Sequence, residues 1–290
     1  MPVETVNLNL WPKCDLKCRY CYGRYPHRPV SLNGDRWKEI ISLLSEEGVR
    51  RVTFSGGEPT LHPDLLVLLH HARSVGLQTS IVTNGARLSD EMIALLDLVG
   101  MTLDSDEPEV LIQLGRTTAA GGDYLSRFLD VAGRVRGAGV MLKINSVVTR
   151  LNLAADLVPI LLALEPVKWK PLQFTTIVGE NHEDADDLRI TRQEFDGFVD
   201  RHRAPLEAAG IWVQPEDEQT VSSTYVMIDP SGIIYQTSSG MKRYSDPVLE
   251  VGLRRAMAQA GGYDRRGFEG RGGHVDVRRL PIFVGGPSES

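Results

Sequence analysis

TVNLNLWPKCDLKCRYC, residues 5–21, joins a short alternating run to a loop that holds Cys14, Cys18 and Cys21. Apolar and polar residues alternate over residues 5–10, which predicts a strand, because successive side chains of a strand point to opposite faces. The 290-residue chain has no other cysteine. Three cysteines within eight residues cannot all pair as disulfides, so this stretch predicts a shared ligand.

Downstream of this loop, strand-like and helix-like runs alternate along the chain. Further strands are predicted at residues 51–54, 78–83, 101–104, 140–148 and 168–175. Helices are predicted at residues 35–47, 65–74, 89–98, 123–136 and 153–164, and at 191–209, where Thr191 and Glu194 form a capping box. The alternation predicts a parallel sheet with right-handed crossovers. Five or six such units are too few for an eightfold barrel, so we predict an α/β fold, a partial (β/α)6 TIM-like barrel.

The rhythm changes after residue 210, where IWVQ and STYVMID are followed by a PSG turn and IIYQT. This pattern predicts a hairpin, with a helix at residues 248–259 beyond it. We therefore predict a barrel over residues 1–209 and a small C-terminal extension over residues 210–290. Residues 278–290, which end in GGPSES, are predicted to be loosely ordered.

Composition limits the class of protein. The formal net charge is −6, which disfavours a general nucleic-acid surface and restricts any phosphate site to local cations. No window approaches 18 consecutive apolar residues, and the N-terminal residues lack the pattern of a signal peptide. Three clustered cysteines argue against a secreted, disulfide-stapled protein. We expect a cytoplasmic monomer that binds neither membrane nor nucleic acid.

The cysteine spacing, C-x3-C-x2-C, leaves three interpretations open. Buried structural cysteines are the simplest, but clustering of all three disfavours that reading. A structural zinc site needs four ligands, commonly two close pairs, and here no second pair exists and His27 is a poor fourth ligand. A cubane iron–sulfur cluster has four irons, so three cysteines would leave one iron open to another ligand.

With GGEP (residues 56–59) after the second strand, this loop resembles the radical S-adenosylmethionine superfamily. In that superfamily the amino and carboxylate groups of S-adenosylmethionine (SAM) occupy the open iron. The resemblance therefore implies a [4Fe-4S] cluster on the three cysteines and SAM as a second cofactor. It further implies that SAM is bound by Tyr20, Ser55, Gly56, Gly57, Glu58, Asn84, Ser105, Arg116 and Asn145.

Individual roles follow from this resemblance. Tyr20 matches an aromatic position near the adenine, and Glu58 can help to balance the sulfonium charge. Arg116 would pair the methionine carboxylate through a bidentate fork, and Ser105 and Asn145 offer hydrogen bonds to the ribose. Taken alone, Ser105 could equally be a helix cap or a turn residue.

Other stretches resemble the viperin family of nucleotide-modifying enzymes over nearly the whole chain. They are FSGGEP (54–59), LKINSVVTRLN (142–152), PVKWK (166–170), VGEN (178–181), QPEDEQ (214–219), STYVMID (223–229), VLEVG (248–252) and GRGG (270–273). The resemblance implies a C-terminal extension that closes over a nucleoside triphosphate. It implies conversion of CTP to the chain terminator 3′-deoxy-3′,4′-didehydro-CTP, with UTP, GTP or another nucleotide as alternatives. A flavodoxin or ferredoxin would supply electrons.

The substrate residues combine this resemblance with local chemistry. A triphosphate carries about four negative charges and needs concentrated cations and backbone donors. Lys168 and Lys170 alternate in an apolar strand, so both face one side, and Trp169 faces the core. The implied nucleotide contacts are Asn7, Arg51, Lys143, Lys168, Lys170, Glu216, Arg271, Gly272 and Gly273, and Tyr225 is the implied catalytic residue. Tyr225 could instead be a core tyrosine with a satisfied hydroxyl.

Two departures from the animal members stand out. The chain lacks their N-terminal amphipathic helix and C-terminal tryptophan, so we expect a different route of cluster loading. Gly270 and His274 stand where animal forms place lysines around RGG, which leaves the phosphate contacts and the preferred base open. The remoter alternative, a non-catalytic iron–sulfur or zinc sensor, would not need GGEP, Arg116 and KINS together.

Overall fold

A computed structural model describes residues 3–25, 31–117, 123–221 and 223–270. Its described strands form one ten-stranded sheet in the order β10-β9-β8-β1-β2-β3-β4-β5-β6-β7. The strands are β1 Thr5–Trp11, β2 Arg51–Gly56, β3 Gln78–Thr83, β4 Leu98–Thr102, β5 Met141–Val148, β6 Lys168–Gln173, β7 Trp212–Val213, β8 Met227–Ile228, β9 Ile233–Ser238 and β10 Met241–Pro247.

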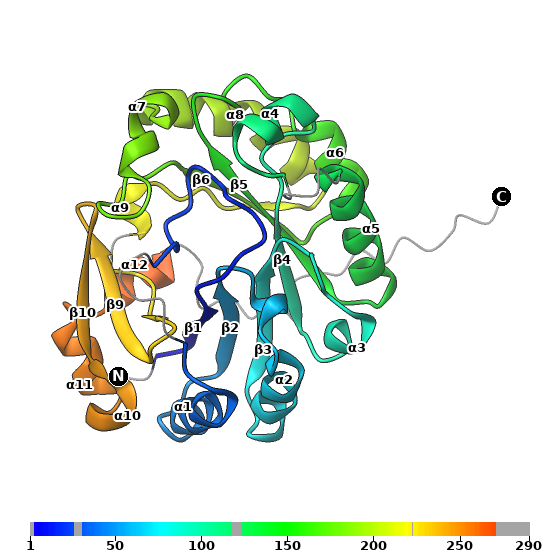
Figure 1. The fold of residues 1–290 in the computed structure, drawn as a ribbon. Helices are drawn as coiled ribbons and strands as arrows, with labels where there is room; N and C mark the ends of the chain where they lie inside the picture. Colours follow the sequence, from blue (N-terminus) through cyan, green and yellow to red (C-terminus); the bar gives the residue numbers. More distant parts are fainter. Residues whose placement is uncertain (1–2, 26–30, 118–122, 222, 271–290) are drawn as a thin grey trace.

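Strands β1 to β7 run parallel to one another, and the sheet curves into a barrel that does not close (Figure 1). β8 pairs parallel to β1, whereas β9 and β10 pair antiparallel beyond it. The predicted partial barrel with six strand–helix units before residue 210 is confirmed. All carboxyl ends of the parallel strands therefore meet at one edge, where ligands of such folds bind.

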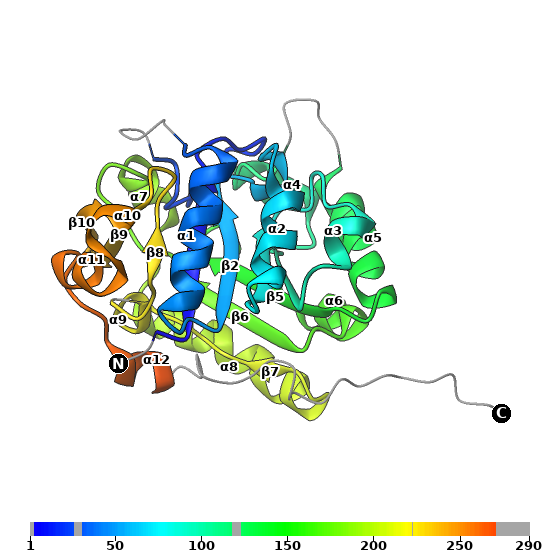
Figure 2. The same ribbon diagram turned by 90° about the horizontal axis from the view of Figure 1, so that it is seen from below.

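Helices cover the outside of the curved sheet (Figures 1 and 2). They are α1 Gly34–Glu46, α2 Leu65–Ser74, α3 Asp90–Ile93, α4 Pro108–Gln113, α5 Tyr124–Gly137, α6 Val158–Leu164, α7 Ala185–Leu188, α8 Arg192–Ala208, α9 Glu218–Val221, α10 Val248–Val251, α11 Leu253–Gln259 and α12 Arg265–Gly270. Short 3-10 turns lie at Pro59–Leu61 and His182–Asp184. None of the helices in these described stretches is long and apolar enough to cross a membrane.

The strands separate an apolar outer face from a polar inner face. Leu8, Phe54 and Trp169 are fully buried and belong to the core between the strands and the helices. The alternate residues of the same strands, such as Asn7 and Lys170, line a cavity inside the barrel. Strand alternation alone produces this division, because the convex face needs apolar side chains and the concave face is left for ligands.

Several predicted boundaries were wrong. The helix at Ser89, which caps Met92 as expected, ends at Ile93, and β4 begins at Leu98 rather than 101. The run from 95 to 98 is apolar enough for either state, and pairing of Leu98 with Ser80 in the parallel ladder favours the strand. The helix predicted at 153–164 begins only at Val158. The helix predicted at 248–259 breaks at Gly252, whose φ of 78° is outside the helical region.

The predicted hairpin is confirmed between β8 and β9, but IWVQ is not part of it. Trp212 and Val213 instead extend the parallel sheet beside β6. The proposed boundary at residue 210 remains a prediction. Strands β7 and β8 both follow it in the chain, and they pair with β6 and β1 of the barrel. Strand β10 and helices α4, α7, α9 and α12 had no counterpart in the sequence interpretation. The predictions for residues 271–290 lie outside the described residues.

Candidate functional site

The cysteine loop follows β1 at the carboxyl edge of the barrel. Cys14, Cys18 and Cys21 all line the same cavity, and Cys21 N donates to Cys18 O at 3.1 Å. Burial raises the pKa of the Cys18 thiol to about 11, because a thiolate is costly away from water. Among the residues that the structure describes, no three His, Cys, Asp or Glu side chains converge closely enough to hold a metal ion. The thiols share a cavity without yet surrounding one point.

The GGEP segment packs directly against this loop. Gly57 N donates to Trp11 O at 2.6 Å, and Glu58 N donates to Lys13 O at 2.8 Å. A Cβ at Gly57 would lie 2.2 Å from Lys13 O, so only glycine permits this approach. Gly57 is therefore required where the backbone of the loop meets β2.

Glu58 has a structural role that the sequence did not predict. Its carboxylate is buried and accepts from Thr60 N at 3.0 Å, Asn84 N at 2.7 Å and the hydroxyls of Thr60 and Thr83. Burial raises its pKa, and these hydrogen bonds oppose that rise. Asn84 in turn donates through Nδ2 to Asp15 Oδ1 at 2.7 Å. Glu58 thus ties the ends of β2 and β3 to the cysteine loop.

Asp104, just beyond β4, organises the other side of the loop. It is fully buried, and its Oδ2 accepts from Tyr20 Oη at 2.5 Å and from Arg116 Nε at 2.9 Å. Its Oδ1 accepts from Val147 N at 2.7 Å. Arg116 Nη1 also donates to Tyr124 Oη at 3.1 Å. Arg116 lies beside the cavity, and its pairing with a carboxylate of SAM stays a prediction.

The remaining predicted SAM residues divide into two groups. Ser55 and Asn145 line the cavity, and Ser55 Oγ donates to Asn9 Oδ1 at 2.9 Å. Ser105 is fully buried and is absent from the cavity wall. Its Oγ accepts from Glu107 N at 3.0 Å, which is the turn role that the sequence left open.

The predicted phosphate-binding cations lie at the opposite end of the same cavity. Arg51 is the first residue of β2 and Lys168 the first of β6, so both begin their strands at the amino edge of the barrel. Lys143 lies on β5, where it is the register partner of Gly100 on β4 and of Lys168 on β6. A Cβ at Gly100 would lie 2.9 Å from Lys143 Cε, so glycine leaves room for this lysine. The residues predicted to bind the cofactors and those predicted to bind phosphate therefore lie toward opposite ends of one barrel.

Lys168 is held in a dry, positively charged environment. Its Nζ donates to Gln214 Oε1 at 2.8 Å and lies 3.6 Å from the centre of the Trp212 ring. Burial, followed by Lys170, Lys143 and Arg51, lowers the pKa of Lys168 to about 6. An anion placed among these cations would offset the repulsion that they exert on Lys168, so the geometry suits a polyanion.

Buried Lys170 and Glu216 form a polar group with the half-buried Tyr225 between the two ends. Lys170 Nζ lies 2.6 Å from Glu216 Oε1, and Tyr225 Oη donates to Glu216 Oε2 at 2.7 Å. Lys170 Nζ also donates to Tyr225 Oη. All three side chains line the cavity. Glu216 and Tyr225 come 46 and 55 positions after Lys170 in the sequence, so the fold brings them together.

The cavity itself has a volume of about 400 Å³, within the range of small-molecule sites. Of the predicted nucleotide residues, Asn7, Arg51, Lys143, Lys168, Lys170, Glu216 and Tyr225 line it, and Arg271, Gly272 and Gly273 lie outside the described residues. A second cavity of about 680 Å³ lies beside β7, α9 and α12 and is more open to solvent. Among the described residues that line it there is no cysteine and none of the predicted cations.

Sequence reasoning missed several residues of the main site. The hydroxyls of Tyr235 on β9 and Tyr25 form a hydrogen bond of 3.0 Å, and Tyr235 Oη accepts a second one from Asn9 Nδ2 at 3.1 Å. Gln214 supports Lys168, and Asp104 joins Tyr20 to Arg116. The only signal for Gln214 was its two-residue spacing from Glu216 in QPEDEQ. Nothing local marked Tyr235, because its partners are more than 200 positions away.

The family comparison agrees with this geometry. The model of the radical SAM superfamily matches residues 8–157, which include the cysteine loop, GGEP and Arg116. The chain belongs to the radical SAM superfamily. The superfamily uses a [4Fe-4S] cluster and SAM, and three thiols on one cavity-lining loop are a fitting donor set for a cluster with one open iron.

Relatives of the chain within this superfamily are nucleotide dehydratases. The S-adenosylmethionine-dependent nucleotide dehydratase of Flammeovirga pacifica is 32% identical over 91% of this chain and 93% of that protein. The enzyme of the same name from Lacinutrix mariniflava is 32% identical over 93% of this chain, which spans only 58% of that protein. S-adenosylmethionine-dependent nucleotide dehydratase RSAD2 of Danio rerio is 29% identical over 93% of this chain and 77% of its own length. At this identity and coverage the chain is a member of this viperin-type dehydratase family.

Solved structures support the fold. Streptococcus suis SuiB bound to S-adenosylmethionine superposes with a TM-score of 0.64 at 17% identity, covering 79% of this chain and 59% of SuiB. Native anSMEcpe with bound AdoMet and a Kp18Cys peptide gives 0.63 at 15% identity, covering 81% of this chain and 74% of that one. These likenesses concern the barrel alone.

Proposed function

We propose that this chain dehydrates a nucleoside triphosphate, and that its preferred substrate is CTP, converted to 3′-deoxy-3′,4′-didehydro-CTP. The observation that carries the proposal is one cavity lined at one end by the three cysteines that follow β1, and at the other by Arg51, Lys143 and Lys168, with Lys170 between them. A nucleotide whose phosphates lie among the cations would present its ribose toward the cofactor end. UTP and GTP remain alternatives, because the described residues include no feature that selects a base.

The cluster and SAM, when bound, supply a 5′-deoxyadenosyl radical that removes the hydrogen atom from C4′ of the ribose. In the balanced reaction, the nucleotide, SAM, two electrons and one proton are converted to the unsaturated nucleotide, methionine, 5′-deoxyadenosine and water. Arg51, Lys143 and Lys168 hold the phosphates and so determine which hydrogen lies nearest the radical. Tyr225, hydrogen-bonded to Glu216 and Lys170, is suited to deliver the proton that leaves with the 3′-hydroxyl.

The product would lack a 3′-hydroxyl and terminate nucleic-acid synthesis, so an antiviral role forms part of the proposal. The electrons would come from a flavodoxin or ferredoxin, and the cytoplasm and the monomeric state stay predictions.

The reconstituted, reduced protein should be incubated with SAM and each nucleoside triphosphate separately. We expect 5′-deoxyadenosine and a nucleotide lighter by one water, most rapidly with CTP. Cys18→Ala should abolish both, and Lys168→Met should weaken nucleotide use while Lys38→Met, an exposed change on α1, should not. If no nucleotide stimulates SAM cleavage, the proposed function is wrong.

A further inference from the structure

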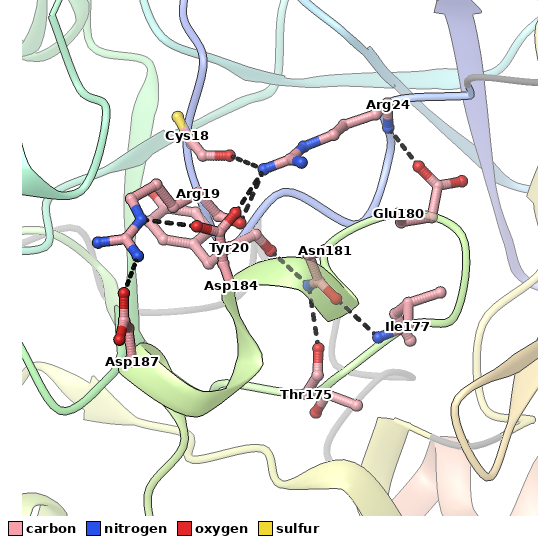
Figure 3. Close-up of polar contacts among 10 residues, drawn as sticks. All are labelled: Cys18, Arg19, Tyr20, Arg24, Thr175, Ile177, Glu180, Asn181, Asp184 and Asp187. Carbon is pink, nitrogen blue, oxygen red and sulfur yellow. Dashed lines mark hydrogen bonds and ion pairs between the residues drawn. The ribbon is translucent and has the colours of Figure 1, made fainter.

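Residues 177–187, here named the clasp segment, pack against the second half of the cysteine loop (Figure 3). GGEP and Asn84 hold the first half of the loop near Cys14, as described above. The clasp segment lies between β6 and α8, more than 150 residues from the cysteines. The clasp segment therefore holds the loop from a third part of the barrel, in addition to GGEP with Asn84 and to Asp104 on Tyr20.

Asn181 is the first anchor of the clasp segment. Its side chain is 1% exposed, and Nδ2 donates to Tyr20 O at 2.9 Å and to Thr175 O at 3.1 Å. Its Oδ1 accepts from Ile177 N at 2.7 Å. The amide thus joins the peptide just before Cys21 to two backbone groups of its own loop (Figure 3).

Glu180 is the second anchor. Its Oε2 accepts from Arg24 N at 2.8 Å and from Tyr25 N at 3.1 Å, and its Oε1 pairs with Lys242 of β10. Lys242 Nζ also donates to Tyr22 O at 2.8 Å. Tyr25 has a φ of 49°, a conformation that residues with side chains adopt rarely and keep only where contacts impose it. Glu180 supplies one of those contacts.

Arginines complete the arrangement. Arg24 Nη2 donates to Cys18 O at 3.0 Å and to Arg19 O at 2.8 Å, and Arg19 Nε pairs with Asp184 at 2.7 Å (Figure 3). Because Asn181 Nδ2 donates to Tyr20 O, the consecutive carbonyls of Cys18, Arg19 and Tyr20 each accept a hydrogen bond from a side chain. The backbone that carries two cluster ligands is hydrogen-bonded at every peptide oxygen.

We propose that Asn181 and Glu180 are positioning residues that fix the backbone from Cys18 to Tyr25 in the shape required for cluster binding, before any cluster is present. Neither residue touches the thiols, so their effect on the cluster acts through the loop. The inference depends on the cluster assignment and is independent of the nucleotide proposed above.

The test compares Asn181→Ala and Asn181→Asp with Asn152→Ala. Asn152 is a matched control: it is 2% exposed, Nδ2 donates to two carbonyls, of Asp104 and Val147, and Oδ1 accepts from Thr149 N. In cluster-free protein, both Asn181 variants should speed amide deuterium exchange in residues 14–25 by about fivefold or more, because hydrogen bonds of the loop are lost. Asn181→Asp tests the donor, since it keeps the acceptor oxygen and removes both donated hydrogen bonds.

Iron content after anaerobic reconstitution is the second readout, with Glu180→Ala and the milder Glu180→Gln included. We expect about half the wild-type iron or less for the alanine variants, and an altered response of the cluster's EPR signal to added SAM. Asn152→Ala loses hydrogen bonds at Asp104 and Val147 rather than on the loop itself, so it should retain more iron than Asn181→Ala. Unchanged exchange and full iron in Asn181→Ala would overturn the inference. A wild-type protein that loads no iron would instead overturn the cluster assignment, and loading without nucleotide turnover would count only against the proposed function.

Discussion

Lys170 and Glu216 form an ion pair of 2.6 Å whose carboxylate is fully buried in the barrel. A buried charge that loses its partner is costly, whereas removal of both charges is much less so. We expect Glu216→Ala to lower the free energy of unfolding by about 3–5 kcal/mol. The double variant Lys170→Met/Glu216→Leu should recover a large part of this loss. Urea denaturation of wild type, Lys170→Met, Glu216→Leu and the double variant completes a double-mutant cycle, and additive losses would contradict a direct interaction.

Tyr225 can be tested by removal of one oxygen atom. Tyr225→Phe keeps the ring and removes the hydroxyl that donates to Glu216 Oε2 at 2.7 Å. If this hydroxyl delivers a proton, nucleotide turnover should fall by about a hundredfold while 5′-deoxyadenosine still forms. Quantifying both products in one assay measures the uncoupling. Equal losses of the two products would assign Tyr225 to SAM binding or to packing.

Lys168 predicts a pH-dependent affinity for nucleotide. Its pKa of about 6 lies below the ordinary value of 10.5. Between these two pH values the unfolded chain binds more protons than the folded protein does. The destabilisation that comes from burying Lys168 therefore becomes smaller as the pH rises. Phosphates beside Nζ raise the pKa again, so binding above pH 6 should take up a proton. The affinity should then fall by up to about tenfold per pH unit through this group.

Calorimetry in buffers of different ionisation enthalpy measures that proton uptake directly. Lys168→Met provides the control, because the nucleotide's own titration is common to both proteins. The variant should bind more weakly and take up fewer protons. Identical uptake in both proteins would show that Lys168 is already charged before binding.

Gly57 and Gly133 form a matched pair of glycine substitutions. A Cβ at Gly57 would meet Lys13 O at 2.2 Å, whereas at Gly133, inside α5, nothing lies within 4 Å. Gly57→Ala should therefore cost about 1–3 kcal/mol through overpacking. Gly133→Ala should stabilise the protein by about 0.5–1 kcal/mol. Thermal unfolding ranks the two variants, and a Gly57→Ala protein as stable as wild type would disprove the close approach.

The sequence predicted most of the barrel because its strands carry two signals at once. Residues such as Trp169 and Lys170 alternate between core and cavity, and helix patterns separate one strand from the next. The signal failed where an apolar run fits both states, as near Leu98. It also failed for two-residue strands such as β7, which only pairing with β6 defines.

The candidate site likewise divides into residues that the sequence predicted and residues that only the fold brings together. Cys14, Cys18, Cys21 and GGEP are local in sequence. Their spacing left several kinds of site open, and the family resemblance that they carry predicted the cluster and SAM. Asp104, Glu180, Asn181 and Tyr235 were not predicted as site residues, because each acts through partners that only the fold brings near.

By itself, the sequence determined the class of fold and predicted which cysteines hold the cluster, since periodicity and ligand spacing are properties of neighbouring residues. Only the tertiary structure decided that cofactor residues and cations lie at opposite ends of one cavity. Parallel strands produce that arrangement: residues that begin strands gather at one edge and residues that follow them gather at the other, whatever their distance along the chain.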